Sequence, residues 1–343
     1  MTNTVERPTT KRSRGWWPAV ALFLLSPLFG EYLLGNLAFS DLPMLPFLAL
    51  LYGAGTLLIR ETARRFGRGS ATMLLLGVAY ALIEEGLVDQ MLFNHDYFAG
   101  QAQESDTILA ALGIDAWLTL VVVAMHTIWS TYIPITLLEA LVPARATRPW
   151  LGPVGTAVTA VVFVAGSVLL GWVVHSETGF LASAGQLTGT SIVVIVLVAA
   201  AFLIPRPGAG SDRAAPRRWL AGLVAFAASS LFMFTEVLPG WTEVAAAVTL
   251  VVVFTVVVVR WSRSRGFGVR DRLALVAGGV LTYAWLGMTM EPETGPRSTL
   301  DQVGAVLIAG FAIALVVLAF RTTRGGRGAV EDPPIVASRR VQP

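Results

Sequence analysis

The sequence predicts an all-α, polytopic helical membrane protein with about ten transmembrane helices, and three observations predict it. Of its 343 residues, 55% are hydrophobic and 14% are charged, whereas about a quarter of the residues in a soluble domain are charged. The mean hydropathy is +0.68. Apolar runs of about 20 residues, the length that crosses a bilayer as a helix, recur along the whole chain. These observations exclude a water-soluble globular protein.

Ten apolar segments have about the spanning length, and each is expected to form one membrane helix. They cover residues 16–36, 43–60, 71–93, 116–138, 150–174, 189–205, 219–238, 243–260, 272–290 and 302–320. The first segment follows a basic stretch, as the apolar part of a signal peptide does, but no small-residue cleavage site follows it. We therefore expect it to remain as the first span.

Charge alternates between the gaps that separate the ten segments. Arginine and lysine occupy the N-terminal stretch and every second gap, and acidic residues occupy the gaps between, where Arg297 is the only basic residue. Because basic residues beside membrane helices stay on the cytoplasmic side, the pattern predicts a bacterial plasma membrane protein with both termini cytoplasmic. It also explains the net charge of +3 without nucleic acid. The expected partner is the lipid bilayer, and any protein partner or peptide substrate stays open.

Short matches 203 positions apart suggest an internal repeat of spans 1–4 in spans 7–10. Phe23-x2-Ser26-x-Leu28-Phe29 matches Phe226-x2-Ser229-x-Leu231-Phe232, and Tyr80-Ala81 matches Tyr283-Ala284. Parallel repeats occur in membrane proteins, although apolar composition and alternating charge also produce such matches by chance. The predicted organisation is a cytoplasmic N-terminal segment 1–15, a four-helix unit 16–145, a two-helix linker unit 146–210, a second four-helix unit 211–320, and a disordered cytoplasmic tail 321–343.

The third and fourth spans carry ionisable side chains inside the predicted hydrocarbon region. Such a residue costs about 2.5–3.5 kcal/mol on insertion scales, which makes it a functional hypothesis by default. Glu84 and Glu85 lie on the third span, and His126 lies on the fourth at a similar depth, roughly 15 Å below the outer surface. We therefore predict Glu84, Glu85 and His126 as catalytic residues.

Four further residues are candidates for a supporting or proton-relay role: Glu31, Asp89, Ser130 and His95. Asp89 shares a helix face with Glu85, and Ser130 shares one with His126. Serines so placed on membrane helices usually bond a backbone carbonyl, and His95 falls at the outer boundary.

Two carboxylates and an imidazole also suit a divalent metal, so Glu84, Glu85 and His126 are the candidate ligands if there is a metal. No cofactor motif is evident. The chain has no cysteine, which excludes thiolate chemistry.

Three functions for the cluster stay open on the residues alone. A carboxylate beside a histidine can act as a general base in an enzyme. The same groups can carry protons in a proton-coupled transporter. As a structural or accessory subunit, the protein would use them only to bond neighbouring helices.

A Glu-Glu pair on one membrane helix followed by a His-x3-polar motif on a later one resembles the CPBP family, the CAAX-processing and bacteriocin-processing intramembrane proteases. In that family the pair opens a Glu-Glu-x3-Arg motif and activates water, and histidines from Phe-x3-His and His-x3-Asn motifs polarise the scissile carbonyl. Glu84, Glu85 and His126 match the pair and the last histidine. The resemblance implies a divergent CPBP-like intramembrane protease.

The chain departs from the CPBP pattern at three places. Asp89 stands at the arginine position, Ser130 stands at the asparagine position, and no Phe-x3-His lies between the two motifs. His95, two residues after Phe93, is a displaced substitute at best. These departures leave open a relative without the activity.

A second likeness covers more of the first four spans. Gly30-Glu-Tyr-Leu-Leu34, Leu51-Tyr-Gly-Ala-Gly-Thr-Leu-Leu-Ile-Arg-Glu61, Glu84-Glu-Gly-Leu87 and the stretch from His126 to Pro134 are similar to segments of uncharacterised bacterial multi-pass membrane proteins. This likeness implies no activity.

Overall fold

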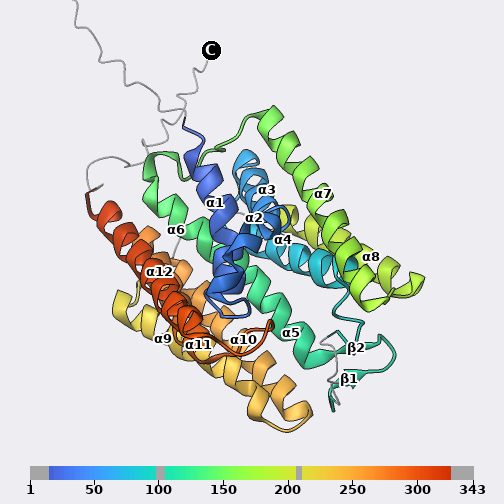
Figure 1. Cartoon of the computed structure of the whole chain (residues 1–343). Helices are drawn as coiled ribbons and strands as arrows, with labels where there is room; N and C mark the ends of the chain where they lie inside the picture. Colours follow the sequence, from blue (N-terminus) through green and yellow to red (C-terminus); the bar gives the residue numbers. More distant parts are fainter. Residues whose placement is uncertain (1–14, 98–104, 206–210, 326–343) are drawn as a thin grey trace, which may run out of the picture.

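The computed structural model describes residues 15–97, 105–205 and 211–325, and the described chain is almost entirely helical (Figure 1). The elements of the first four predicted spans are α1 (Trp17–Pro27), η1 (Leu28–Tyr32), η2 (Phe39–Met44), α2 (Leu45–Ala49), α3 (Tyr52–Arg65), α4 (Ser70–Ile83), η3 (Glu84–Val88), β1 (Ile108–Leu109), β2 (Ile114–Asp115), α5 (Ala116–Met125), η4 (His126–Tyr132), α6 (Ile133–Leu141) and η5 (Pro143–Arg145).

The remaining elements follow in the same alternation of long helices and short connections. They are α7 (Pro153–Thr178), α8 (Ala184–Leu203), β3 (Ser211–Ala214), α9 (Arg218–Met233), η6 (Phe234–Val237), α10 (Trp241–Ser262), β4 (Ser264–Arg265), α11 (Val269–Thr289) and α12 (Thr299–Gly325). Strands β1 and β2 form a short hairpin, and β3 pairs with β4. The prediction of an all-α polytopic membrane protein is confirmed.

The first two predicted spans differ from simple membrane helices. Within the described residues, eight helices are long and apolar enough to cross a membrane, and they coincide with predicted spans three to ten. The second predicted span is a pair of helical segments, Phe39–Ala49 and Tyr52–Arg65, bent by 49°. Gly166 of α7 packs against the backbone of Leu50 at this bend, where an added Cβ would lie 2.7 Å from the Leu50 carbonyl carbon. The first helix ends with η1 at Tyr32 and is shorter than the others.

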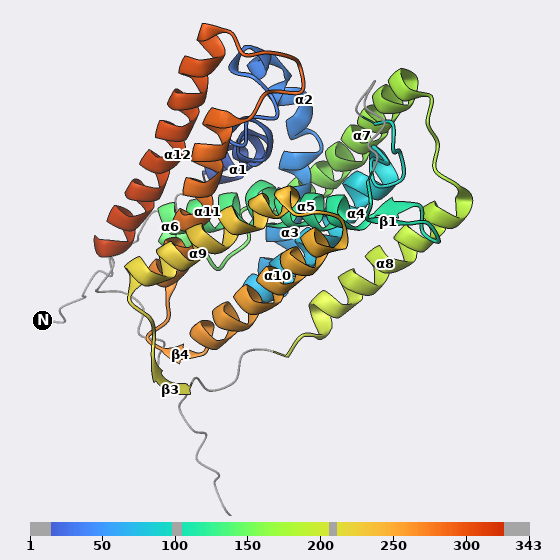
Figure 2. The same cartoon turned by 90° about the horizontal axis from the view of Figure 1, so that it is seen from below.

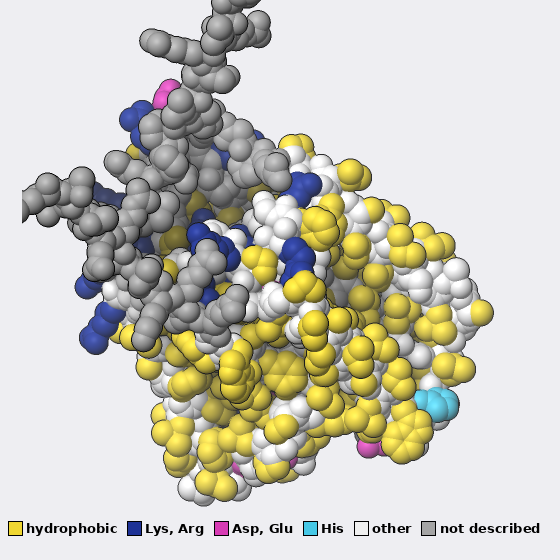
Figure 3. Space-filling view, turned by 90° about the horizontal axis from the view of Figure 1, so that it is seen from above, with side chains coloured by type: hydrophobic (Ala, Val, Ile, Leu, Met, Phe, Trp, Pro, Cys, Tyr) yellow, Lys and Arg dark blue, Asp and Glu magenta, His cyan; other side chains and the backbone are white. Residues whose placement is uncertain are grey.

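The segments that connect the predicted spans lie at two opposite ends of the bundle. The basic connections lie at one end and the acidic connections at the other, as the alternation of charge predicts. At the basic end, Arg145 donates to the Gly15 carbonyl at 2.6 Å and Arg68 donates to the Ile204 carbonyl at 2.9 Å. Figure 3 shows arginine side chains gathered toward this end, with a hydrophobic surface beyond them. At the acidic end, the Gln90 side chain accepts from the Ala182 amide at 2.7 Å. The chain therefore passes between the same two ends in every predicted span.

The helices divide into a central group and a lipid-facing periphery. The α4–η3 helix, the α5–η4–α6 helix and α11 bury most of their side chains, whereas α7, α8 and α10 bury few. Figure 2 shows α4, α5 and α6 through the middle, with α7 and α8 on one side and α9, α11 and α12 on the other. Val161 of α7 and Ile195 of α8 are 69% and 67% exposed. Such apolar surfaces suit contact with lipid.

Helix packing repeats in part between the two four-helix units. Helix α1 packs against α3 as α9 packs against α10, and α4 packs against η4 as α11 packs against α12. Helix α9 also packs along α11, whereas the corresponding pair, α1 and α4, makes at most marginal contact. The suggested parallel repeat stays a prediction.

The predicted tail begins too early. Helix α12 continues through Arg321 and Arg324 to Gly325, because no helix-breaking residue interrupts the apolar helix before that point. The expected disorder of the rest of the tail, and the N-terminal segment up to residue 14, lie outside the described residues.

Gly53 permits the close approach of α3 to α1, and we expect its replacement to destabilise the protein. An added Cβ on Gly53 would lie 2.1 Å from the Phe23 carbonyl oxygen, which belongs to the backbone and cannot swing aside. We expect Gly53→Ala to lower the free energy of unfolding by about 1–3 kcal/mol, the usual cost of overpacking. Thermal unfolding of the detergent-solubilised chain measures the change.

The matched control is Gly189→Ala on α8, where an added Cβ meets no heavy atom within 4 Å. Since alanine is about 1 kcal/mol better than glycine inside a helix, this variant should melt at or above the wild-type temperature. Equal melting of both variants would contradict the close contact of α1 with α3.

Candidate functional site

Three π-helical segments among the described residues carry the candidate site. Glu31 lies in η1, Glu84 and Glu85 open η3, and His126 opens η4. Each segment closes with a bond spanning five residues, such as Asp89 N to Glu84 O at 3.0 Å. A π-helical turn holds an extra residue, which redirects side chains and often marks a functional site. All three segments direct polar residues into the same part of the bundle.

His126 lies between the two glutamates and contacts each through a different ring nitrogen. Its Nε2 is 2.5 Å from Glu85 Oε1, and its Nδ1 is 3.2 Å from Glu84 Oε2. All three side chains are buried. The structure therefore brings together the three residues that the sequence predicts as catalytic. A charged imidazolium would have a carboxylate on each side, which is the pairing that a buried charge requires.

Glu31 joins the cluster through a tyrosine. The Tyr52 hydroxyl donates to Glu31 Oε1 at 2.6 Å, and the Tyr52 ring centroid is 5.5 Å from that of His126. Asn36 donates to the other oxygen of Glu31 at 3.3 Å. Tyr80 completes the aromatic surround, with its ring centroid 6.3 Å from that of His126.

Ser130 links the cluster to hydroxyl side chains of neighbouring helices. Its hydroxyl is 3.4 Å from His126 Nδ1, and its carbonyl accepts from Ser26 at 2.7 Å and from Thr56 at 3.2 Å. The close approach depends on Gly30, where an added Cβ would lie 2.6 Å from Ser130 Oγ. The contact of Ser130 with the site is thus a supporting one.

Asp89 and His95, the other two predicted supporting residues, lie toward the acidic end. Asp89 follows η3 directly and accepts from the Met91 amide at 3.1 Å, so its side chain stabilises the turn after the helix. His95 is exposed and lines a small cavity of about 10 Å³ together with Asn94 and Asp115. The structure does not place His95 against His126.

The two tyrosines beside His126, Tyr52 and Tyr80, were not among the residues predicted from the sequence. Tyr80 lies four residues before Glu84 on the same helix face, a spacing that could have indicated it. Tyr52 approaches the site only because the second span is bent just before it. No local pattern predicts that bend.

The arrangement does not suit a metal ion. Among residues 15–97, 105–205 and 211–325, no group of three or more His, Asp or Glu side chains is placed to hold one. Glu84 and Glu85 lie against different nitrogens of His126, whereas one ion would need a single ring nitrogen and both carboxylates around a common point. The three residues suit proton transfer better.

The two sides of the cluster differ in their access to water. Toward the acidic end, Glu31 and Asp89 are partly exposed. Toward the basic end, Leu22, Ile133 and Leu137 are at most 1% exposed and belong to the main hydrophobic core. Within the described residues, the cluster is therefore closed toward the basic end and bordered by partly exposed acids toward the acidic end.

Glu293 lies toward the acidic end, in the loop before α12, and its side chain is exposed. Desolvation, together with the nearby Glu31 and Glu85, raises the pKa of Glu293 to about 7. The folded chain then binds a proton that the unfolded chain has lost, so this residue makes stability fall as the pH rises from about 4.5 to 7.

We expect the stability of Glu293→Gln to fall less than that of the wild type as the pH rises from about 4.5 to 7, because the glutamine amide stays neutral over this range. Melting temperatures between pH 5 and pH 8 measure it, with Glu291→Gln, an exposed acid two residues away, as the control. A Glu293→Gln variant with the full wild-type pH dependence would contradict the assignment.

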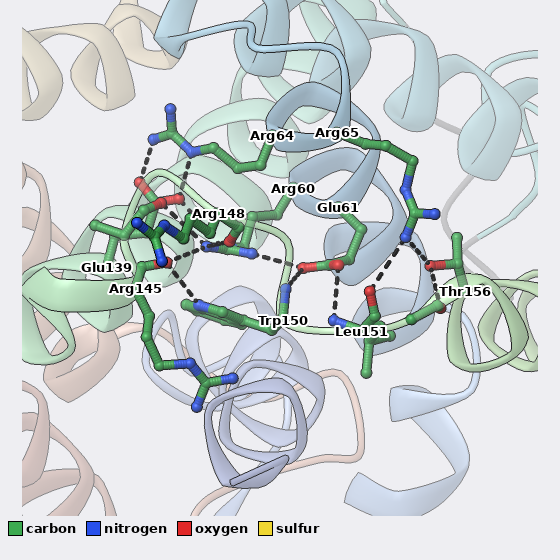
Figure 4. A network of polar contacts seen from close by, with 12 residues as sticks. Arg60, Glu61, Arg64, Arg65, Glu139, Arg145, Arg148, Trp150, Leu151 and Thr156 are labelled. Atoms are coloured by element: carbon green, nitrogen blue, oxygen red, sulfur yellow. Dashed lines mark hydrogen bonds and ion pairs between the residues drawn. The ribbon is translucent and has the colours of Figure 1, made fainter. Parts of the chain in front are cut away.

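A second buried polar network closes the basic end (Figure 4). The Arg60 guanidinium is fully buried, lies 2.6 Å from Glu61 Oε1 and 3.1 Å from Glu139 Oε1, and stacks 3.3 Å from the centre of the Trp150 ring. It also donates to the carbonyls of Arg145, Ala146 and Arg148.

Glu61 holds the other half of this network. It accepts from the backbone amides of Trp150 and Leu151, each at 2.9 Å. The network therefore fastens α3 to the end of α6 and to the loop before α7.

The comparisons with known proteins agree with the membrane fold. No curated protein and no solved structure matches the chain. The sequence profile of an uncharacterized membrane protein family matches residues 20–338, which is nearly the whole chain and includes every candidate site residue. The chain belongs to this uncharacterized membrane protein family.

Proposed function

We propose that the chain is a membrane-embedded hydrolase, a glutamate and histidine peptidase, whose general base is Glu85. The observation that carries the proposal is the hydrogen bond between His126 Nε2 and Glu85 Oε1 at 2.5 Å, with Glu84 Oε2 at ion-pair distance, 3.2 Å, from the other ring nitrogen. Groups in such contact exchange protons readily and are the usual agents of general acid and base catalysis. The family match implies no activity and does not point to the CPBP proteases, so the proposal rests on this geometry.

Glu85 has an oxygen available for the reaction. Its Oε1 contacts His126, whereas its Oε2 is buried without a hydrogen-bond partner among the described residues. A buried oxygen of this kind needs a partner, and a water molecule supplies one. Glu85 would take a proton from this water while the water oxygen bonds to the carbonyl carbon of a peptide bond.

The remaining groups complete the proton balance. The proton held by Glu85 passes to the amine nitrogen as the carbon–nitrogen bond breaks, which restores the carboxylate. His126 holds Glu85 in position and shares its charge with Glu84 through the second ring nitrogen. Tyr52 connects the cluster to Glu31, which is partly exposed.

The closed packing on the basic side favours an enzyme over a carrier. A proton-coupled carrier needs a polar path that opens to alternate sides. The core on the basic side is closely packed. A hydrolase needs access for water and substrate from one side only.

The test is the appearance of new protein N-termini in membranes. Purified wild-type chain is added to membranes of the source organism from which its gene has been deleted, and new N-termini are identified by mass spectrometry. We expect cleavages that require Glu85 and His126. The matched control is Glu236→Gln, an exposed acid outside the cluster.

Identical N-termini for wild type and Glu85→Gln at equal amounts of folded chain would overturn the proposal. In liposomes carrying a pH-sensitive dye, proton flux that depends on Glu85 would identify a carrier instead. The absence of both activities, with reduced stability of Glu85→Gln, would leave the cluster with a packing role.

A further inference from the structure

A long apolar groove runs along the outside of the bundle, between α1 and α12. Helix α6 packs against both helices and forms the floor, while α1 and α12 make at most marginal contact with each other. Figure 1 shows α6 between them. The groove has a volume of about 490 Å³ and extends from Trp17 to Leu28 on α1 and from Phe311 to Thr322 on α12.

The length of the groove matches one leaflet of a bilayer. Eleven residues separate Trp17 from Leu28, which is about 16 Å along a helix, and half of a hydrocarbon core of about 30 Å is about 15 Å. Trp17 and Thr322 mark the basic end, and Leu28 and Phe311 lie near the middle of the bundle. Tryptophan is typical of the boundary between the hydrocarbon and the headgroups.

The lining and its charged end select the occupant. An acyl chain is apolar along its whole length and ends at a headgroup. The lining is apolar apart from Thr322, which lies at the end where a headgroup would be.

Two arginines flank the headgroup end. Arg321 is exposed and lies one turn beyond Leu318, a lining residue. Arg145 follows α6 and donates to the carbonyl of Gly15, close to Trp17. Arginine pairs well with phosphate oxygens, and basic residues at the membrane surface attract anionic lipids.

We propose that this groove binds one anionic phospholipid from the leaflet at the basic end. One acyl chain lies along α6 between α1 and α12, and the phosphate lies beside Arg145 and Arg321. The lipid completes the packing of α1 and α12, which otherwise meet only through α6. This site is separate from the cluster around His126, and its test does not depend on any catalytic activity.

The test is native mass spectrometry of the full chain released from nanodiscs that contain equal amounts of phosphatidylglycerol and phosphatidylcholine. We expect one retained phosphatidylglycerol. Ala21→Phe fills the groove from α1 and should abolish retention, whereas Val161→Phe, which adds the same ring to a lipid-facing side chain that is 69% exposed, should not.

Arg321→Gln tests the headgroup contact without altering any buried residue. We expect affinity for phosphatidylglycerol to fall about fivefold, as loss of one basic residue at an anionic surface implies. Arg263→Gln, an exposed arginine at the same end but beyond α10, should retain wild-type affinity. Equal retention of both lipids by the wild type, or wild-type retention by Ala21→Phe, would overturn the proposal.

Discussion

Replacing Arg60 with alanine is expected to lower the free energy of unfolding by about 3–5 kcal/mol, the usual cost of removing one partner from a buried ion pair. The guanidinium is fully buried and holds Glu61, Glu139 and three backbone carbonyls. Alanine would leave two carboxylates without this partner and would remove the guanidinium donor from the carbonyls of Ala146 and Arg148, whereas the Arg145 carbonyl keeps a donor in Trp150 Nε1. Thermal unfolding and size-exclusion chromatography in detergent measure the loss.

Three variants test whether the lost stability comes from the buried Arg60 network or would follow from removing any arginine. Arg265→Ala should not change the melting temperature, because its pair with Asp212 is 3.4 Å long and largely exposed, and exposed pairs contribute little. Arg60→Lys keeps the charge but loses the planar fork, so it should fall between wild type and Arg60→Ala. Arg60→Met combined with Glu61→Gln should recover part of the loss. An Arg60→Ala variant that melts like wild type would contradict the network.

Glu85→Gln is expected to reduce the formation of new N-termini by about 10²–10⁴-fold, the range for losing a general base. Glutamine keeps the shape of the side chain but cannot accept the proton of the attacking water. His126→Gln should cause a loss of the same order, because it removes the group that positions Glu85 at 2.5 Å. Glu84→Gln should cost less, because Glu84 is 3.2 Å from the second ring nitrogen.

The amount of folded protein must be equal across these variants, since each changes a buried polar contact. Monodisperse elution and the melting temperature provide that check, and Glu236→Gln provides the baseline. If Glu84→Gln and Glu85→Gln reduced cleavage equally, the assignment of the base to Glu85 would be wrong, although the site itself would stand.

The alternation of basic and acidic connections between the two ends of the bundle could be predicted, because arginine is costly in hydrocarbon and therefore collects at helix ends. The same cost made Glu84, Glu85 and His126 conspicuous inside their spans. Their depth follows from the rise of a helix, so their meeting could be expected before any contact was known. These predictions use only local composition and a fixed helix geometry.

The remaining features depend on contacts between distant segments. The π-helical turns at Glu31, Glu84 and His126 arise where helices pack together, as Gly30 does on Ser130, and no local pattern encodes them. Arg60 and Glu61 resemble ordinary boundary charges in the sequence. They are buried because the loop from 145 to 151 folds back over them, which hydropathy does not reveal.

The network around Arg60 also constrains the order in which the chain assembles during synthesis. Its carbonyl partners at Arg145 and Arg148, and the Trp150 and Leu151 amides that bind Glu61, lie 85 to 90 positions later in the chain. At about 5–20 residues per second, these partners emerge roughly 5–20 s after Arg60. Until then the charges at the basic end of α3 lack their buried partners, so we expect the second span to reach its final packing only after the fourth has been inserted.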